Sequence, residues 1–103
     1  IGLRFAKNAL ERTRHETQRL LQSALEQARL DAQNLPVQQE AARVAERGLA
    51  EVRQRLALGA VTALDELAAR ASLEAAQGTL LAAQMRILED LYQLYAVLGV
   101  GSL

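Results

Sequence analysis

Apolar side chains recur every three or four residues along almost the whole chain, which is the spacing of one face of an α-helix. The first such stripe predicts a helix from about residue 3 to residue 34, and its members are Leu3, Ala6, Leu10, Thr13, Thr17, Leu20, Ala24 and Ala28. The only proline, Pro36, lacks a backbone donor and clashes with the preceding turn, so it predicts a break or a strong kink. Because the helical pattern resumes at once, no long loop is expected there.

Two more helices are predicted, over residues 37–58 and 62–98. The stripe of the second comprises Val37, Ala41, Val44, Gly48, Val52 and Leu56. The third helix has two apolar faces, a mostly small one (Leu67, Ala71, Ala75, Gly78, Ala82, Met85) and a mostly large one (Leu73, Leu80, Ile87, Leu91, Leu94, Leu98). A helix that is apolar on two sides needs neighbours on two sides. Two arrangements stay open: a larger layer or closed ring of helices, and a three-segment bundle in which the first helix folds back onto the third at Pro36.

Residues 59–62 predict a tight reversal between two antiparallel helices. Gly59 is expected to end the second helix with a positive φ, which glycine adopts without steric cost. Thr62 is expected to cap the third helix, with Asp65 completing a capping box. Val61 is expected to be exposed at the tip of the turn. The sequence therefore predicts an all-α protein, a long antiparallel helical hairpin or coiled-coil-like bundle with a break near Pro36.

Composition agrees with long, closely packed helices. Half of the residues are hydrophobic, yet only 3% are aromatic, too few to anchor a thick globular core. Basic and acidic residues number 12 each, so there is no basic excess to suggest nucleic-acid binding. Cysteine is absent, which excludes disulfides and thiolate metal sites. No apolar run approaches the roughly 18 residues of a membrane helix, and the start lacks both Met and a signal-peptide layout. We expect a mature product, a fragment or the ordered part of a longer protein.

Candidate catalytic chemistry is sparse, and we expect neither enzymatic activity nor a metal or cofactor. The only histidine, His15, lies between charged residues and is expected at the surface. Glu89 and Asp90 are adjacent, so they do not share a helix face as paired catalytic carboxylates would. Tyr92 and Tyr95 are three residues apart and are expected to pack while their hydroxyl groups reach water.

From Val52 to Gly101 the order of features resembles the C-terminal helical hairpin of TolC-like outer-membrane efflux proteins, the outer membrane factors. Shared features are a glycine-containing turn with Ser or Thr, an Asp and a Leu after it, an Ala/Gln-rich helix and an LY-x-x-LG-x-G tail. The matching residues are Leu56, Gly59, Thr62, Asp65, Leu67, Ala69, Leu73, Leu91, Tyr92, Leu94, Tyr95, Leu98, Gly99 and Gly101. The resemblance is weaker over residues 5–51, where the family has another long helix.

The resemblance implies a homotrimeric channel whose long helices form a periplasmic tunnel below an outer-membrane β-barrel. This chain would then be a fragment of an α-helical barrel, on the periplasmic side of the outer membrane. The tunnel is a passive conduit that docks on a periplasmic adaptor (membrane fusion) protein and, through it, on an inner-membrane pump. The resemblance assigns adaptor docking to the turn residues Gly59, Ala60, Val61 and Thr62, and the entrance constriction to Asp65.

The chain departs from the family near the turn. Ala68 stands where a second acid often follows Asp65, and Leu56 and Val61 replace a Tyr and an Arg that latch the entrance in some members. An apolar constriction or a different gate is therefore expected in place of a polar latch. The alternative is a stand-alone soluble helical hairpin that binds a partner helix, of which a periplasmic adaptor hairpin would be one form.

Overall fold

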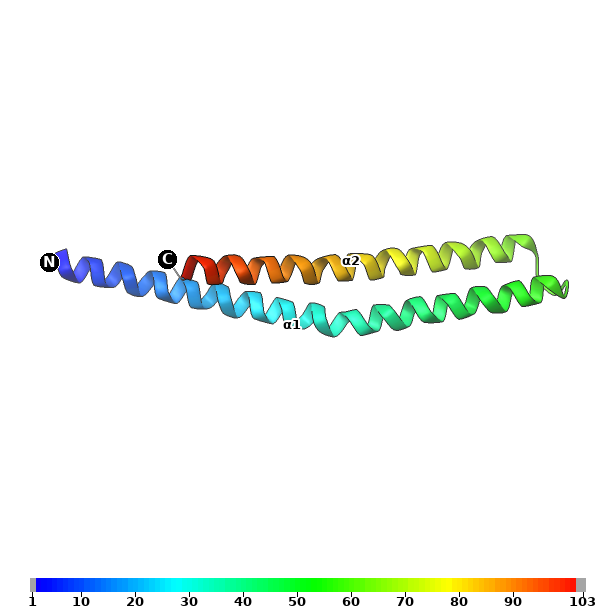
Figure 1. The fold of residues 1–103 in the computed structure, drawn as a ribbon, viewed down its shortest axis with the longest axis horizontal. Helices are drawn as coiled ribbons and strands as arrows, with labels where there is room; N and C mark the ends of the chain where they lie inside the picture. The colour runs from blue at the N-terminus through cyan, green and yellow to red at the C-terminus, as the bar shows by residue number, and fades with distance from the viewer. Residues whose placement is uncertain (1, 102–103) are drawn as a thin grey trace.

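The chain folds into two long antiparallel α-helices joined by one turn (Figure 1). A computed structural model describes residues 2–101, with α1 spanning Gly2–Ala57 and α2 spanning Ala63–Gly101. The molecule is a rod of 86 × 17 × 16 Å. The first part of α1 extends past the end of α2, so it has no neighbouring helix (Figure 1). The predicted all-α antiparallel hairpin is confirmed.

The predicted break at Pro36 is wrong, because Pro36 lies inside α1. The three-segment bundle is wrong for the same reason, since α1 never folds back. α1 does change direction near its middle, where the ribbon is cyan, and a proline in a helix is a usual cause of such a bend (Figure 1). Across the proline, the Gln38 Nε2 group donates a hydrogen bond of 3.2 Å to Asn34 Oδ1. The seam residues Leu35 and Gln38 pack against α2 on both sides of Pro36, and this packing favours a continuous helix despite the missing backbone donor.

The two helices meet along a seam, which we define as the buried and half-buried positions spaced alternately by three and four residues. On α2 these are Glu66, Ala69, Leu73, Ala76, Leu80, Ala83, Ile87, Asp90, Leu94 and Val97. On α1 they are Thr17, Leu21, Ala24, Ala28, Asp31, Leu35, Gln38, Ala42, Ala45, Leu49, Val52 and Leu56. This alternation places a seam residue every 3.5 residues on average, which is the repeat of a left-handed coiled coil.

The contact face of α1 differs from the predicted stripes in part. Thr17, Ala24, Ala28, Val52 and Leu56 lie in the seam as expected. Elsewhere between Thr17 and Leu56 the seam lies one position further along the chain than the predicted stripes. Other predicted members, among them Leu3, Leu10, Leu20, Val37 and Val44, are exposed. The predicted stripes consist mainly of apolar residues, whereas the seam also contains the polar side chains Asp31 and Gln38.

The large face of α2 packs against α1 through Leu73, Leu80, Ile87 and Leu94, as predicted. Its other two predicted members, Leu91 and Leu98, are exposed. α2 also continues to Gly101, past the end predicted at residue 98, so Gly99 does not end the helix.

The core is thin, as expected for a structure with only two helices. Among the described residues, the buried hydrophobic side chains are Ala42, Leu49 and Ala83. Small alanines in the seam let the two backbones approach, but they bury little apolar area. Most of the large apolar side chains of the hairpin therefore remain in contact with solvent.

Candidate functional site

The end of α1 closes with a hydrogen-bonded cap around Gly59. Gly59 has a φ of 75°, which confirms the predicted left-handed conformation. Its N–H donates to the carbonyl of Leu56 at 3.0 Å, and the N–H of Ala60 donates to the carbonyl of Arg55 at 2.9 Å. These two bonds define a Schellman motif, which satisfies carbonyls at the end of a helix.

The start of α2 is fixed by Thr62 and Asp65, as predicted. Asp65 Oδ2 accepts hydrogen bonds from the Thr62 N–H at 2.9 Å and from the Thr62 hydroxyl at 3.1 Å. The Asp65 N–H donates back to Thr62 Oγ1 at 3.4 Å. This is a capping box in which Asp65 provides the carboxylate three residues after the N-cap Thr62. Its negative charge also interacts favourably with the positive N-terminal end of the helix dipole. The turn is therefore a rigid element with both helix ends satisfied.

The five candidate residues from the sequence lie together at this end of the rod. Gly59, Ala60 and Thr62 are exposed, whereas Val61 is half-buried, so its predicted full exposure is wrong. Asp65 is exposed and its carboxylate is engaged by Thr62. Its role as an entrance constriction remains a prediction.

Two large apolar residues that sequence reasoning missed flank the turn. Leu58 is 83% exposed and Leu64 is 73% exposed. We call residues 58–64 the tip. Leu58 follows the last α1 residue and Leu64 is the second residue of α2, so neither has a neighbour across the seam. Both could have been predicted from their positions, since Leu58 lies two residues after Leu56, the last seam residue of α1, and Leu64 lies two residues before Glu66, the first seam residue of α2.

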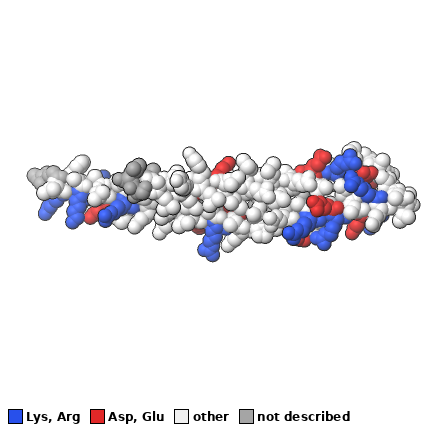
Figure 2. Space-filling view, viewed as in Figure 1, with Lys and Arg blue, Asp and Glu red and all other residues white. Residues whose placement is uncertain are grey.

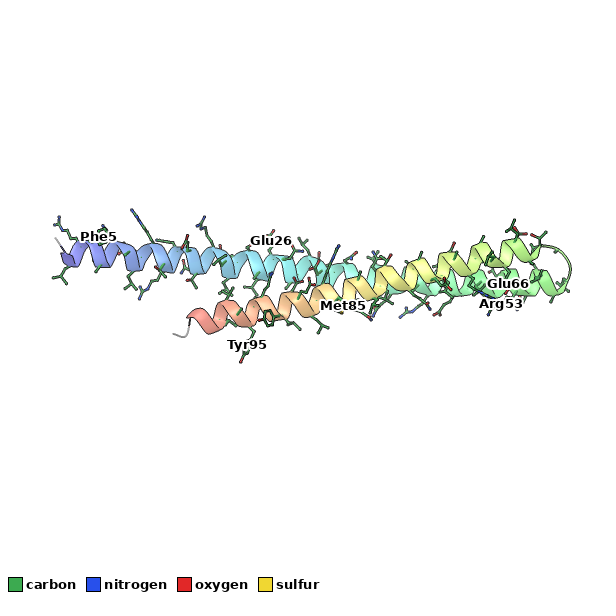
Figure 3. The ribbon with its side chains drawn as sticks, turned by 90° about the horizontal axis from the view of Figure 1, so that it is seen from above. Phe5, Glu26, Arg53, Glu66, Met85 and Tyr95 are labelled. Carbon is green, nitrogen blue, oxygen red and sulfur yellow. The ribbon has the colours of Figure 1, made fainter. Side chains whose placement is uncertain are left out.

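An ion-pair cluster joins the helices close to the tip. Glu66 Oε1 lies 3.5 Å from Arg53 Nε on α1 and 3.1 Å from Arg70 on α2 (Figure 3). The contact between Arg53 and Glu66 joins the two helices beside the turn. Charged side chains also gather near this end of the rod on the face shown in Figure 2.

A second apolar surface runs along the side of α2 that faces away from α1. We call it the outer stripe. Its members are Leu64, Leu67, Ala71, Glu74, Gly78, Leu81, Met85, Leu88, Tyr92 and Tyr95. They are all exposed, and they alternate by three and four residues as the seam does. Tyr95, for example, points away from α1 (Figure 3). Only Glu74 in the outer stripe is charged, so α2 does have two apolar faces. The second face differs in part from the predicted small one, because Ala75 and Ala82 lie off it and Leu81, Leu88, Tyr92 and Tyr95 belong to it.

Gly78 is a member of the predicted face of mostly small residues. In this hairpin a Cβ atom built on Gly78 would meet nothing within 4 Å. Gly78 therefore faces open space on the outer stripe, and α1 is not the helix that approaches it.

Comparison of the chain with protein-family models, with curated proteins and with solved structures found no match. Within residues 2–101, no group of three or more His, Asp or Glu side chains is placed to hold a metal ion. No helix in the described part of the chain is both long enough and apolar enough to cross a membrane. The structural features that can support a function are the tip, the outer stripe and the seam.

Proposed function

We propose that this hairpin is a segment of the periplasmic tunnel of an outer-membrane efflux channel, in a tripartite export system. In this role it is a passive conduit wall. Neighbouring helices cover the outer stripe, and the tip docks on a periplasmic adaptor protein that links the channel to an inner-membrane pump. The assembled channel would be a homotrimer of the full-length protein.

The observation that carries this proposal is the outer stripe. A hairpin that functions alone needs one apolar seam and a polar outer surface, because one neighbour covers each helix. α2 instead has a second stripe with the same alternating spacing on its opposite side. In a layer of hairpins packed side by side, α2 would have α1 on one side and a helix of the next hairpin on the other. This arrangement accounts for both the seam and the outer stripe.

The tip supports the docking part of the proposal. Its backbone is held by the Schellman motif and the capping box, so its shape is fixed before any partner binds. Leu58 and Leu64 present apolar area next to exposed backbone at Gly59 and Ala60. A rigid apolar end with few mobile side chains loses little conformational entropy on docking.

Site-specific cross-linking in the full-length parent protein tests the proposal. The chain has no cysteine, so a cysteine introduced at Ala60 provides a unique attachment point for a cross-linker within this segment. We expect cross-links from residue 60 to the adaptor. We also expect Ala60→Asp to reduce adaptor capture and export, because it places a charge in an apolar contact.

Ala6→Asp is the matched control, since Ala6 is also an exposed alanine but lies on the free end of α1. Equal adaptor capture by Ala60→Asp and Ala6→Asp would refute docking through the tip. Unchanged helicity of both variants by circular dichroism would confirm that the hairpin itself remains folded.

The outer stripe also fits a stand-alone module that binds one partner helix. The encoding reading frame separates the two functions. A reading frame of several hundred residues supports the channel if its upstream part contains segments in which apolar and polar residues alternate, as in β-strands. A reading frame close to the length of this chain supports the module.

A further inference from the structure

Two acidic residues occupy the seam, one on each helix. Asp31 of α1 is 8% exposed and Asp90 of α2 is 7% exposed, and they are the buried polar residues of the described chain. Each is a member of the alternating pattern that defines the seam. The seam residues on either side of Asp90 are the apolar residues Ile87 and Leu94, and those on either side of Asp31 are Ala28 and Leu35.

The hydrogen bonds of the two carboxyl groups are unequal. Gln27 Nε2 lies 3.2 Å from both Oδ1 and Oδ2 of Asp31, so its amide donates to that carboxylate. Asp90 Oδ2 is fully buried and has no donor. A buried carboxylate oxygen without a hydrogen-bond partner is costly, particularly opposite a second carboxylate.

A single proton removes this conflict. If Asp90 is protonated, its hydroxyl can donate to Asp31, and the unpartnered oxygen becomes a hydrogen-bond donor. Asp31 then stays ionised, held by Gln27 and by the Asp90 hydroxyl. Two carboxyl groups that share one proton are a known arrangement where like charges cannot both be kept.

The pKa values of the pair agree with this assignment. The hydrogen bond with Asp31, burial and the negative charges of Asp31 and Glu89 raise the pKa of Asp90 to about 6, although Arg86 opposes the shift. The hydrogen bonds from Asp90 and Gln27, with help from Arg86, lower the pKa of Asp31, although burial opposes this shift. Arg86 and Glu89 on α2 and Asp31 on α1 are the charged groups that act on Asp90.

We propose that Asp31 and Asp90 form a proton-binding site across the seam, in which one shared proton joins α1 to α2 and its release loosens the middle of the hairpin. The site is far along the rod from the tip and does not depend on the proposed function. It makes the fit of the two helices sensitive to mildly acidic pH.

The direction of the pH effect follows from proton linkage. Between pH 3.8, the ordinary pKa of Asp, and about pH 6, the folded chain keeps a proton on Asp90 that the unfolded chain has already released. Stability from this group is therefore present at low pH and is lost as the pH rises through about 6. Asp31 has the opposite effect. Its pKa is lowered in the folded chain, so its contribution to stability is present above the ordinary pKa of Asp and is lost as the pH falls and Asp31 becomes protonated. The pair thus contributes most between about pH 4 and pH 6.

The experiment is a set of thermal melts of the full chain from pH 4.5 to 8, with Asp90→Asn as the test variant. We expect the melting temperature of the unaltered chain to drop as the pH rises through about 6. Asp90→Asn should remove this step, because its amide donates to Asp31 at every pH. Glu74→Gln, which neutralises an exposed carboxylate on the outer stripe, is the matched control and should retain the step.

A carboxyl carbon NMR titration of the unaltered chain gives a second measurement that does not depend on the folding of a variant. We expect Asp90 to titrate near pH 6, and Asp31→Asn to move that midpoint downward because it removes the neighbouring charge. A midpoint for Asp90 near 4 in the unaltered chain would overturn the proposal. A pH step that persists in Asp90→Asn would overturn it as well.

Discussion

Replacing Gly59 tests the turn that defines the hairpin. Gly59 has a φ of 75°, and a Cβ atom added there would meet nothing within 4 Å. Any cost of Gly59→Ala is therefore conformational and does not come from a clash. The left-handed region costs an L-residue about 1–2 kcal/mol. Replacing Gly by Ala also lowers the entropy of the unfolded chain, which stabilises the folded chain by about 0.4–1 kcal/mol and offsets part of this cost.

The free energy of unfolding should therefore fall by about 1 kcal/mol in Gly59→Ala, which corresponds to a drop of about 4–8 °C in the melting temperature of a domain of this size. Gly59→Val should cost more, because a β-branched residue is a genuine outlier at positive φ. Thermal melts followed by circular dichroism at 222 nm measure both values. The isolated 103-residue chain is sufficient for this comparison.

Gly48→Ala is the matched control. Gly48 lies inside α1, and a Cβ atom there would also meet nothing within 4 Å. Because its φ is not positive, alanine should stabilise the helix by about 0.5–1 kcal/mol. The same substitution is thus expected to have opposite signs at the two glycines. A rise in melting temperature for both would refute the assignment of Gly59 as the helix-ending residue.

Three further changes have expected outcomes. Thr62→Ala should lower the free energy of unfolding by about 1 kcal/mol in denaturant titrations, because the capping hydroxyl is lost. Pro36→Ala should raise it by as much as about 3 kcal/mol, since it restores a backbone donor inside α1, and an unchanged midpoint would show that the bend costs nothing. The chain should self-associate through the outer stripe, which sedimentation experiments can measure. The double variant Met85→Gln, Leu88→Gln should weaken this self-association more than Leu25→Gln does. A clean monomer at high concentration would contradict self-association.

The turn was the part of the fold that local chemistry specified best. Gly59 needs a conformation that only glycine adopts cheaply, and Thr62 and Asp65 have the spacing of a capping box. These effects act within a few residues, so the sequence alone was enough to predict them. The continuity of α1 through Pro36 depends instead on contacts with α2 along the seam. A penalty of about 3 kcal/mol at one residue predicts a break only if nothing else holds the two halves in line.

The register of the seam was harder to predict than its existence. α1 has apolar residues on more than one face, so several stripes fit the helical period equally well. The true seam includes Asp31 and Gln38, which a search for apolar residues passes over. Asp90 could not be recognised as half of a pair from its neighbour Glu89, because its partner lies across the hairpin. Only the antiparallel register brings it opposite Asp31.

The two helices differ in what their outer surfaces require. On α1, Glu40 lies 3.3 Å from Arg43 and 3.1 Å from Arg47, so the surface around Glu40 is charged and suited to water, although Val37 and Val44 nearby are exposed apolar residues. α2 has Leu81, Met85 and other large apolar residues on its outer side. Burying one such side chain contributes about 1.5–3 kcal/mol, a gain that the hairpin alone forgoes repeatedly along the outer stripe. A neighbouring helix packed on the outer stripe of α2, on the side opposite α1, would recover this gain over the whole length of that stripe.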